Sequence, residues 1–548
     1  MAGAGDHPRL GASRVIRYRP PNRTTIYDKN AYVRGALQQE DEFNLLQENG
    51  PRLLLEQEVP DLTITQTTLA TSLDIQLDMV PVVDVSDTTN SPNGRTKHIS
   101  VGELGEAIGI FNVKKYGVTL DGVTDDTAAW EDALNDISSG QTLLCAGGTS
   151  KVTSLIDVPA VDVKIIGHHA TINSTHATSV FRQQNRGNLF EIDGLAFTGT
   201  AKAFHYDALD LPAGPTPFQT QHFEYHIRNC RFLQDATTEA LYLYGAREGL
   251  VRDCYFETNK GIYTSFSIEP HVVNCHFKNT AQDIFSDTGS EGLKVIGGMS
   301  LGSTTGIRCS QNAGVQLLGI LWDGSQPVLL QGTTEVGITN CYIASRTSNP
   351  AIETAIVNAV RCQNISITGC PALISNYNNA SSYSIILAGT DKIVIADSHI
   401  FNWQANGISY SDTTYLDVHD NVINPKAATG TYSIACTGTD SATNRIHNNV
   451  LGKTMNGITT KNLWNNAGYV TENGGTDAVA SGTTSKTVTH GLAGTPDPQN
   501  IDVVFVVQGT NDYGRWWIGN IGATTFDVFV SVDPGSSLTF YWKARIKT

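Results

Sequence analysis

The chain has 548 residues, of which only 16% are charged, and its formal net charge is −16 at pH 7. This length predicts two to four structural units, and the 51 glycines favour β structure with many turns over long helices. The acidic balance argues against nucleic acid as a partner. Because no apolar run has signal-peptide or membrane-spanning length, we expect synthesis in a cytoplasm and no membrane insertion.

Residues 1–110 differ in kind from the rest and form the first predicted domain. A basic segment with prolines (14–23) precedes an expected helix from Ala31 to Gln57, which Gly50-Pro51 interrupts. The stretch MVPVVDVSDTTNSPNGRTKHISVGEL (79–104) resembles the connector of phage tail-fibre and tailspike proteins. That resemblance implies attachment to the phage tail or baseplate through this N-terminal region. A flexible tail is the alternative.

The next segment, FNVKKYGVTLDGVTDDTAAWEDALND (111–136), predicts a short helix after two aspartates that can serve as N-caps. It resembles the N-terminal signature of the pectate-lyase-like β-helix family, although Leu120 replaces the usual glycine. The matching residues are Val113, Tyr116, Gly117, Asp121, Gly122, Val123, Thr124, Asp125, Asp126, Thr127 and Ala128. Asp121, Asp125 and Asp126 do not have the spacing of an EF-hand loop, so we expect a structural cap and neither a metal nor a cofactor. Calcium binding is the alternative.

A short pattern recurs through the middle of the chain: an apolar residue, any residue, then an Asn, Asp or Gly anchor followed by a small residue. The ten anchors are residues 229, 253, 274, 297, 319, 340, 369, 397, 420 and 448. These residue types tolerate a left-handed backbone, so each copy predicts a strand, a one-residue bend and a second strand. Coils stacked at about 4.8 Å would form a right-handed parallel β-helix over residues 111–465.

Five of the nine cysteines occupy the position directly after an anchor. They are Cys230, Cys254, Cys275, Cys341 and Cys370. We expect a stacked ladder of small buried thiols without disulfides, because buried Cys behaves as a small hydrophobe. A metal or redox role is the alternative.

A third strand is predicted in each coil, and its alternation places one column of side chains on the outer surface. This column contains Tyr242, Tyr263, Phe285, Arg308 and Leu329. On the same face we expect Glu239, Lys260 and Asp283, with Asp287 further along the strands. Exposed rings beside charged groups suit a saccharide, because rings cover the apolar faces of sugars and charged groups bind hydroxyls or uronates. Burial of the rings at a trimer interface is the alternative.

Glycoside hydrolysis needs two carboxyl groups, which lie about 6.5 to 9.5 Å apart in inverting enzymes. Glu239 and Asp283 are two coils apart and one residue out of register, so we expect their backbones about 10 Å apart. This makes them the candidate catalytic pair, with Asp287 as the candidate third member. A lyase acting on a uronate polymer would instead use Lys260, Tyr263 and Arg308.

Residues 466–548 lack the coil pattern and contain alternating apolar runs, which predicts a small antiparallel β-sandwich for trimerisation or carbohydrate binding. Trp516 and Trp517 should face opposite ways in a strand, and either sugar stacking or packing within a trimer or core would explain them.

The resemblance to tailspikes implies a homotrimer in the virion tail that acts at the host cell surface on capsule, O-antigen or exopolysaccharide. Such proteins are commonly endo-hydrolases and sometimes lyases. The rival hypotheses are a non-catalytic receptor-binding fibre of the same fold, a cellular polysaccharide lyase or hydrolase, and a structural protein without a glycan ligand.

Overall fold

The computed structural model describes residues 101–546, except 184–187, 208–223, 235–238, 376–381, 402, 426–429, 459–462, 465, 467–471 and 507–512. Before residue 101 it describes only the backbone of five strands. The chain divides into two compact units, residues 1–104 and 105–548, and each is described by itself. No helix in the described part of the chain is long and apolar enough to span a membrane.

The first unit contains one antiparallel five-stranded sheet in the order β1-β2-β3-β4-β5. The strands are β1 (Asn44–Gln47), β2 (Arg52–Glu56), β3 (Leu62–Thr65), β4 (Met79–Asp84) and β5 (Arg95–Ser100). The helix expected from Ala31 to Gln57 is therefore wrong where β1 and β2 lie. Leu45 pairs with Leu55 and Leu46 with Leu54. In the sequence Gly50-Pro51 lies between these two strands, and proline disfavours the continuous helix that was expected here.

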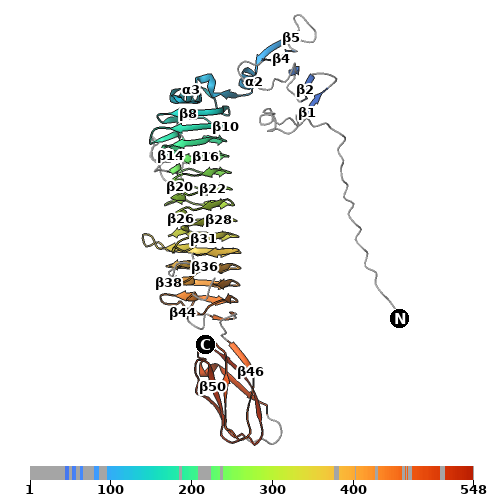
Figure 1. Ribbon diagram of the computed structural model, residues 1–548, viewed down its shortest axis with the longest axis vertical. Coiled ribbons are helices and arrows are strands. Elements are labelled where there is room, and N and C mark those ends of the chain that lie inside the picture. The colour runs from blue at the N-terminus through green and yellow to red at the C-terminus, as the bar shows by residue number, and fades with distance from the viewer. Residues whose placement is uncertain are drawn as a thin grey trace, which may run out of the picture. The chain divides into compact units, whose positions relative to one another are not determined.

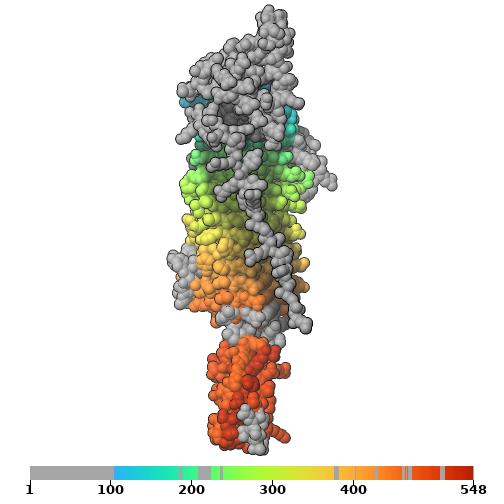
Figure 2. All heavy atoms as spheres, turned by 90° about the vertical axis from the view of Figure 1, so that its right-hand side faces the viewer, coloured from blue at the N-terminus to red at the C-terminus, as the bar shows by residue number. Residues whose placement is uncertain are grey.

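The second unit begins within α2 (Val101–Ala107) and continues into a right-handed parallel β-helix, as the ten-copy pattern predicted (Figure 1). Its N-terminal end contains β6 (Ile110–Asn112), the 3-10 helix η1 (Val113–Tyr116), β7 (Asp121–Asp125), α3 (Thr127–Asp136), β8 (Thr142–Val152) and β10 (Val163–Ser174). Figure 2 shows the successive coils as bands of colour.

Each later coil contributes one strand to each of three stacks of parallel strands. The first strands are β12 (Leu189–Asp193), β15 (Glu224–Arg228), β18 (Leu250–Arg252), β21 (His271–Val273), β24 (Lys294–Ile296), β27 (Gln316–Leu318), β30 (Thr334–Thr339), β33 (Cys362–Thr368), β36 (Thr390–Ala396), β39 (Thr414–His419), β42 (Arg445–His447) and β45 (Leu463–Trp464). The second strands are β13 (Ala196–Gly199), β16 (Arg231–Gln234), β19 (Tyr255–Phe256), β22 (His276–Lys278), β25 (Met299–Leu301), β28 (Leu321–Gly324), β31 (Tyr342–Ser345), β34 (Ala372–Ile374), β37 (His399–Phe401), β40 (Val422–Asn424) and β43 (Val450–Leu451).

The third strands form one 13-stranded parallel sheet, which we call the third-strand sheet. Its members are β9 (Ile156–Val158), β11 (Ser179–Gln183), β14 (Lys202–Asp207), β17 (Glu239–Tyr244), β20 (Lys260–Ser265), β23 (Gln282–Ser286), β26 (Thr305–Ser310), β29 (Gln326–Gln331), β32 (Ile352–Ala355), β35 (Tyr383–Ala388), β38 (Asn406–Ser411), β41 (Tyr432–Cys436) and β44 (Met455–Asn456).

The anchors behave as the sequence predicted. All ten have a positive φ, between 51° and 64°, which only a few residue types adopt without strain. The apolar residues two positions before the anchors are all buried. The bend therefore joins two strands around one continuous core.

The signature aspartates at the N-terminal end form hydrogen bonds within this end of the solenoid. Asp126 accepts from the backbone N–H of Thr119 at 2.8 Å and from the hydroxyl of Ser150 at 2.9 Å. Asp126 is the N-cap residue of α3 but makes no side-chain capping bond, and the carboxylate of Asp125 instead accepts from the backbone N–H of Thr127 at 3.1 Å. Both contacts have the structural role that the sequence predicted for this segment.

Along the solenoid, many of the residues directly after a bend carry a hydrogen-bond donor. All nine cysteines are free and buried. The thiol of Cys254 lies 3.2 Å from the carbonyl of Arg252 and 3.5 Å from that of Ile227 in the preceding coil. Cys therefore donates to backbone as well as filling space, a role that the small-hydrophobe interpretation missed.

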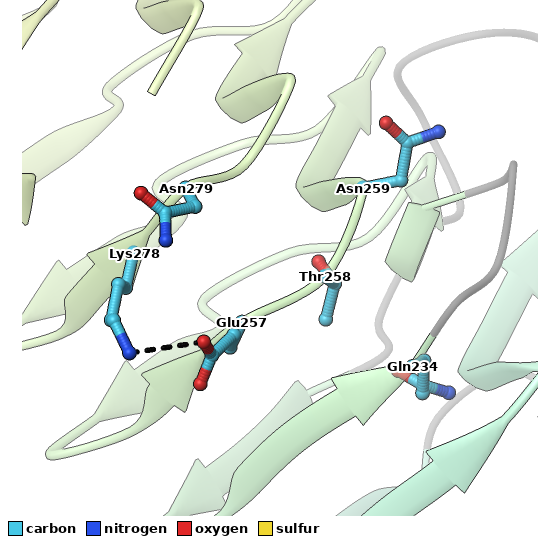
Figure 3. Close-up of a pocket in the computed structure, with 6 residues that line it drawn as sticks. All are labelled: Gln234, Glu257, Thr258, Asn259, Lys278 and Asn279. Atoms are coloured by element: carbon cyan, nitrogen blue, oxygen red, sulfur yellow. Dashed lines mark hydrogen bonds and ion pairs between the residues drawn. The ribbon is translucent and has the colours of Figure 1, made fainter. Parts of the chain in front are cut away.

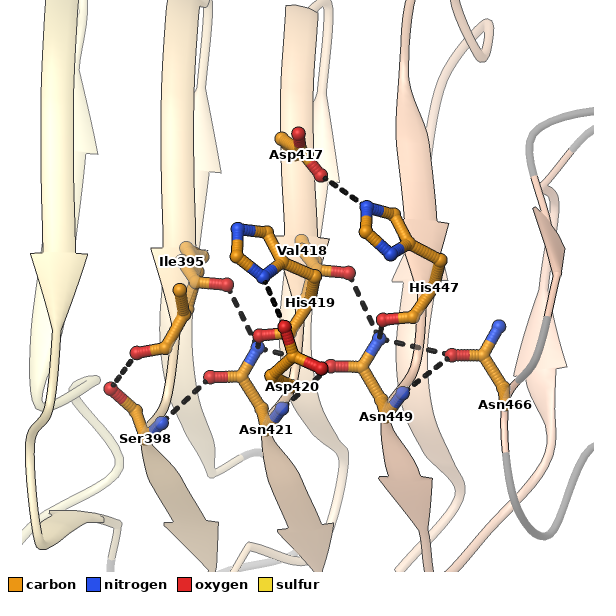
Figure 4. Close-up of polar contacts among 11 residues, drawn as sticks. Ile395, Ser398, Asp417, Val418, His419, Asp420, Asn421, His447, Asn449 and Asn466 are labelled. Carbon is orange, nitrogen blue, oxygen red and sulfur yellow. Dashed lines mark hydrogen bonds and ion pairs between the residues drawn. The ribbon is translucent and has the colours of Figure 1, made fainter. Parts of the chain in front are cut away.

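Asparagine takes over this position at the C-terminal end of the solenoid (Figure 4). The amide of Asn421 donates at 2.8 Å to the carbonyls of His419 and Ile395, the same pair of positions that Cys254 contacts. It also donates to Asn449 at 3.0 Å, and Asn449 donates to Asn466 at 3.0 Å. The ladder thus satisfies buried backbone carbonyls from coil to coil.

The C-terminal residues form two three-stranded antiparallel sheets, in the orders β46-β51-β48 and β47-β50-β49. Their elements are β46 (Glu472–Val479), β47 (Ser485–Thr489), the 3-10 helix η4 (Pro498–Asn500), β48 (Ile501–Phe505), β49 (Trp516–Gly519), β50 (Thr525–Val530) and β51 (Leu538–Arg545). Buried residues of both sheets, such as Val488, Phe526 and Phe540, share one core. We call these residues the C-terminal module.

Candidate functional site

One column of large side chains lies on the outer face of the third-strand sheet, and we call it the ring column. The register of β11, β14, β17, β20, β23 and β26 aligns Arg182, His205, Tyr242, Tyr263, Phe285 and Arg308. Each of these side chains is half-buried, and its neighbours on either side along the strand are buried. The alternation of the strands therefore places the four predicted binding residues Tyr242, Tyr263, Phe285 and Arg308 together.

The rings of this column contact one another from coil to coil. The centroids of His205 and Tyr242 are 4.8 Å apart, and Tyr242 stacks on Tyr263 at 4.9 Å with an interplanar angle of 10°. Tyr263 meets Phe285 edge-on at 5.5 Å, and the guanidinium of Arg308 lies 4.7 Å from the Phe285 centroid. The contacts hold the rings in a continuous row, which ends in a cation–π pair.

A charged column runs beside the ring column at the start of the same strands. Glu239 of β17 pairs in register with Lys260 of β20, which pairs with Gln282 of β23. The ammonium of Lys260 lies 3.3 Å from the carboxylate of Glu239, and the side chains are 38% and 19% exposed. Lys202 lies over the Tyr242 ring at 5.3 Å. A ligand on the rings would therefore meet both signs of charge.

Asp283 does not share this face, contrary to the sequence prediction. Gln282 occupies the position in register with Lys260, so Asp283 points into the core and is fully buried. Its carboxylate accepts hydrogen bonds from the Thr280 hydroxyl, from the Ser303 hydroxyl at 2.7 Å and from the Trp322 indole at 2.9 Å. A shift of one residue along a strand moves a side chain to the opposite face of the sheet. The carboxylate of Asp283 therefore cannot reach a ligand on the outer surface.

Asp287 lies at the far edge of the ring column. It accepts a hydrogen bond from the Tyr263 hydroxyl at 3.2 Å. Burial, with a contribution from Asp287, raises the pKa of Tyr263 to about 12. The position aligned with Glu239 two coils later is Gln282, and Asp287 lies five residues beyond it along the strand direction. The backbones of Glu239 and Asp287 are therefore separated by more than about 15 Å. These two carboxylates do not form a pair within one chain.

A polar pocket of about 310 Å³ lies at the corner that leads into β20 and β23 (Figure 3). Its lining residues are Gln234, Glu257, Thr258, Asn259, Lys278 and Asn279. Lys278 and Glu257 form an ion pair at 3.0 Å, and the Tyr255 hydroxyl donates to Glu257 at 2.8 Å. The Thr258 hydroxyl donates to the carbonyl of Lys260, which places the pocket next to the charged column.

This corner pocket was missed at the sequence level. The only signal was the polar character of the short connections before the third strands, and polar connections are expected on any solvated surface. Their amide, hydroxyl and charged groups can hydrogen-bond a hydroxyl-rich ligand that extends beyond the ring column.

The fold and this surface define a right-handed parallel β-helix with aromatic and charged columns on one outer face. No protein-family model matches the chain, and no curated protein matches it. Phage tailspikes are among the solved structures that are similar to it.

The tailspike gp61 of Pseudomonas phage phi297 is 11% identical, with 80% of this chain and 99% of that chain covered and a TM-score of 0.44. The A-module of mannuronan C-5 epimerase AlgE6 from Azotobacter vinelandii is 15% identical, with 65% and 94% covered and a TM-score of 0.41. The surface adhesin PfbA of Streptococcus pneumoniae is 15% identical, with 60% and 99% covered and a TM-score of 0.42. At these identities and scores the likeness identifies neither a family nor a reaction.

Proposed function

We propose that the chain is a homotrimeric phage tailspike that binds and depolymerises a bacterial surface polysaccharide, namely capsule, O-antigen or exopolysaccharide. The N-terminal region, residues 1–110, attaches it to the phage tail or baseplate. The observation that carries the proposal is the ring column with the charged column beside it, on the outer face of a rigid solenoid. Such a surface can bind a long polymer without a deep cleft.

The ring column suits a sugar polymer in its chemistry and in its repeat. Each coil adds one ring or guanidinium at the strand spacing, so a chain of sugars along the solenoid meets successive apolar contacts. Arg308, Lys260 and Lys202 add cations that bind hydroxyl or carboxylate groups. Many weak contacts along the solenoid then add up to stable attachment.

Endo-hydrolysis is the reaction that we propose, with Glu239 as one of the two carboxyl groups. Glu239 lies on the ligand-facing surface beside the rings. Because Asp283 is buried, we propose that the second carboxyl group comes from a neighbouring subunit of the trimer. The lyase alternative needs a base. Among its candidates, Lys260 is held in an ion pair with Glu239, and the raised pKa of Tyr263 keeps its phenol protonated near neutral pH.

A non-catalytic receptor-binding fibre is the second candidate. The burial of Asp283 favours it, because it removes from the ligand-facing surface the carboxyl group that the sequence paired with Glu239. The same ring column would then serve only to hold the phage on its host.

The test is the length of a polymer that the purified full-length protein binds. Surface polysaccharide extracted from a bacterium to which the protein adheres is incubated with it, and the polymer is sized before and after. Shortening without the ultraviolet absorbance of unsaturated uronate ends is the expected result. Shortening with that absorbance would redirect the mechanism to a lyase, and binding without shortening would make the protein an adhesin.

Replacing Tyr263 by Ala should weaken binding of this polysaccharide about tenfold, a loss of about 1.4 kcal/mol. The substitution removes the ring that contacts both Tyr242 and Phe285. Surface-immobilised polysaccharide and a titration of the protein measure the change. The matched control is Tyr263→Phe, which keeps the ring and loses the hydroxyl that donates to Asp287. Equal binding by the alanine variant and the natural protein would argue against the ring column as the binding surface.

A further inference from the structure

A second surface with exposed aromatic rings lies on the C-terminal module, on the sheet β47-β50-β49. Alternate residues of the central strand β50 are buried in the core of the module, so Asp527 and Phe529 face outwards. Trp517 of β49 pairs with Phe529 and is 49% exposed. The two rings stack with centroids 5.4 Å apart and an interplanar angle of 8°. One face of the indole is thus covered by Phe529, and from its 49% exposure we infer that the other face can meet a flat ligand.

Polar groups border this ring pair on the same face. The carboxylate of Asp527 accepts from the Thr487 hydroxyl at 2.6 Å through one oxygen and from the Asn520 amide at 2.7 Å through the other. A carboxylate can accept about four hydrogen bonds, so each oxygen keeps a further acceptor direction. Gly519 pairs with Asp527 and carries no side chain, and the ring of Phe529 lies over it, next to the carboxylate. The carboxylate is therefore held in a fixed orientation beside the rings.

We propose that Trp517, Phe529 and Asp527 form a glycan-binding site that binds hexopyranose units, separate from the ring column. The free face of the indole would cover the apolar C–H face of a sugar ring, and Asp527 and Asn520 would bind its hydroxyls. A protein partner fits less well, because the cores of protein interfaces are depleted of charged residues, whereas here a carboxylate lies next to the rings of Trp517 and Phe529. This site goes beyond the function proposed above and does not depend on it.

The experiment uses the full-length chain with Tyr263→Ala, so that binding by the solenoid is weakened. Hexasaccharides of glucose, galactose, mannose and N-acetylglucosamine are titrated by isothermal calorimetry. We expect at least one to bind, and we expect Trp517→Ala to weaken that binding at least tenfold. Asp527→Asn should also weaken it, and this variant keeps the shape of the side chain if the loss of Trp517 disturbs the sheet.

The matched control is Tyr541→Ala. Tyr541 is 56% exposed on β51, in the other sheet of the same module. Its loss should leave the affinity unchanged. Binding of none of the four hexasaccharides, or equal losses in the Trp517 and Tyr541 variants, would overturn the proposal. A Trp517 variant that changes the sedimentation of the protein but not its affinity for the hexasaccharides would also overturn the proposal. The surface around Trp517 would then be a contact between copies of this chain.

Discussion

Replacing Glu239 by Gln is expected to slow polymer shortening by about 100-fold or more, since a positioned general acid or base contributes that much. Glutamine has nearly the same shape but cannot donate or accept the proton that glycoside cleavage requires. Its loss of charge also breaks the ion pair with Lys260. That pair is partly exposed, so the fold should lose little stability. The measurement is the rate at which the mean polymer length falls at saturating polymer.

The matched control for this variant is Glu353→Gln. Glu353 lies on β32, on the same outer face, and its carboxylate accepts from the Gln326 amide at 2.7 Å. It should lose little activity, because it lies five coils from Glu239. Binding of the polymer should persist in both variants. An unchanged rate of shortening in the Glu239 variant would exclude this residue from the chemistry.

Replacing Asp283 by Asn should stabilise the protein at pH 7. Burial raises the pKa of this carboxyl to about 6, from an unfolded value of 3.8. The folded state therefore binds a proton that the unfolded state has released between these two pH values. The stability that the protonated carboxyl provides is fully present below pH 3.8 and is lost as the pH rises through about 6. Above that pH the ionised group costs about 3 kcal/mol.

The asparagine variant avoids this cost and keeps a hydrogen-bonding group in the same place. Its oxygen can accept from the Trp322 indole while its amide donates to the hydroxyls of Thr280 and Ser303. Thermal unfolding at pH 7 should show a higher midpoint than that of the natural protein, and the difference should shrink towards pH 4. The control is Asp132→Asn, an exposed residue of α3, which should show no such pH dependence.

A lower midpoint for Asp283→Asn at pH 7 would contradict this account, because it would mean that the hydrogen bonds of the ionised carboxylate outweigh its burial. The same variant also tests whether Asp283 takes part in polymer cleavage. Polymer shortening should continue at the natural rate, since Asp283 is sealed in the core.

The coil was predictable because its signals are local. An anchor with positive φ needs Asn, Asp or Gly, and strand alternation then determines which neighbours are buried. The row from Tyr242 to Arg308 followed from the same alternation. The sequence prediction placed Asp283 on the outer face because it was one residue out of register. Asp283 aligns with Ala240 and Gly261, which face the core, and not with Glu239 and Lys260.

Sequence alone thus determined the parallel β-helix, its ten bends, the buried ladder after them and the aromatic residues on its outer face, because each depends on residue type and spacing within one coil. Only the tertiary structure decided which groups meet between coils. Asp283 is satisfied by Thr280 of its own coil and by Ser303 and Trp322 of later coils, and the corner pocket joins residues of three coils. Such contacts depend on the exact register of strands about 20 residues apart in sequence, and a shift of one residue reverses the face of every side chain in a strand.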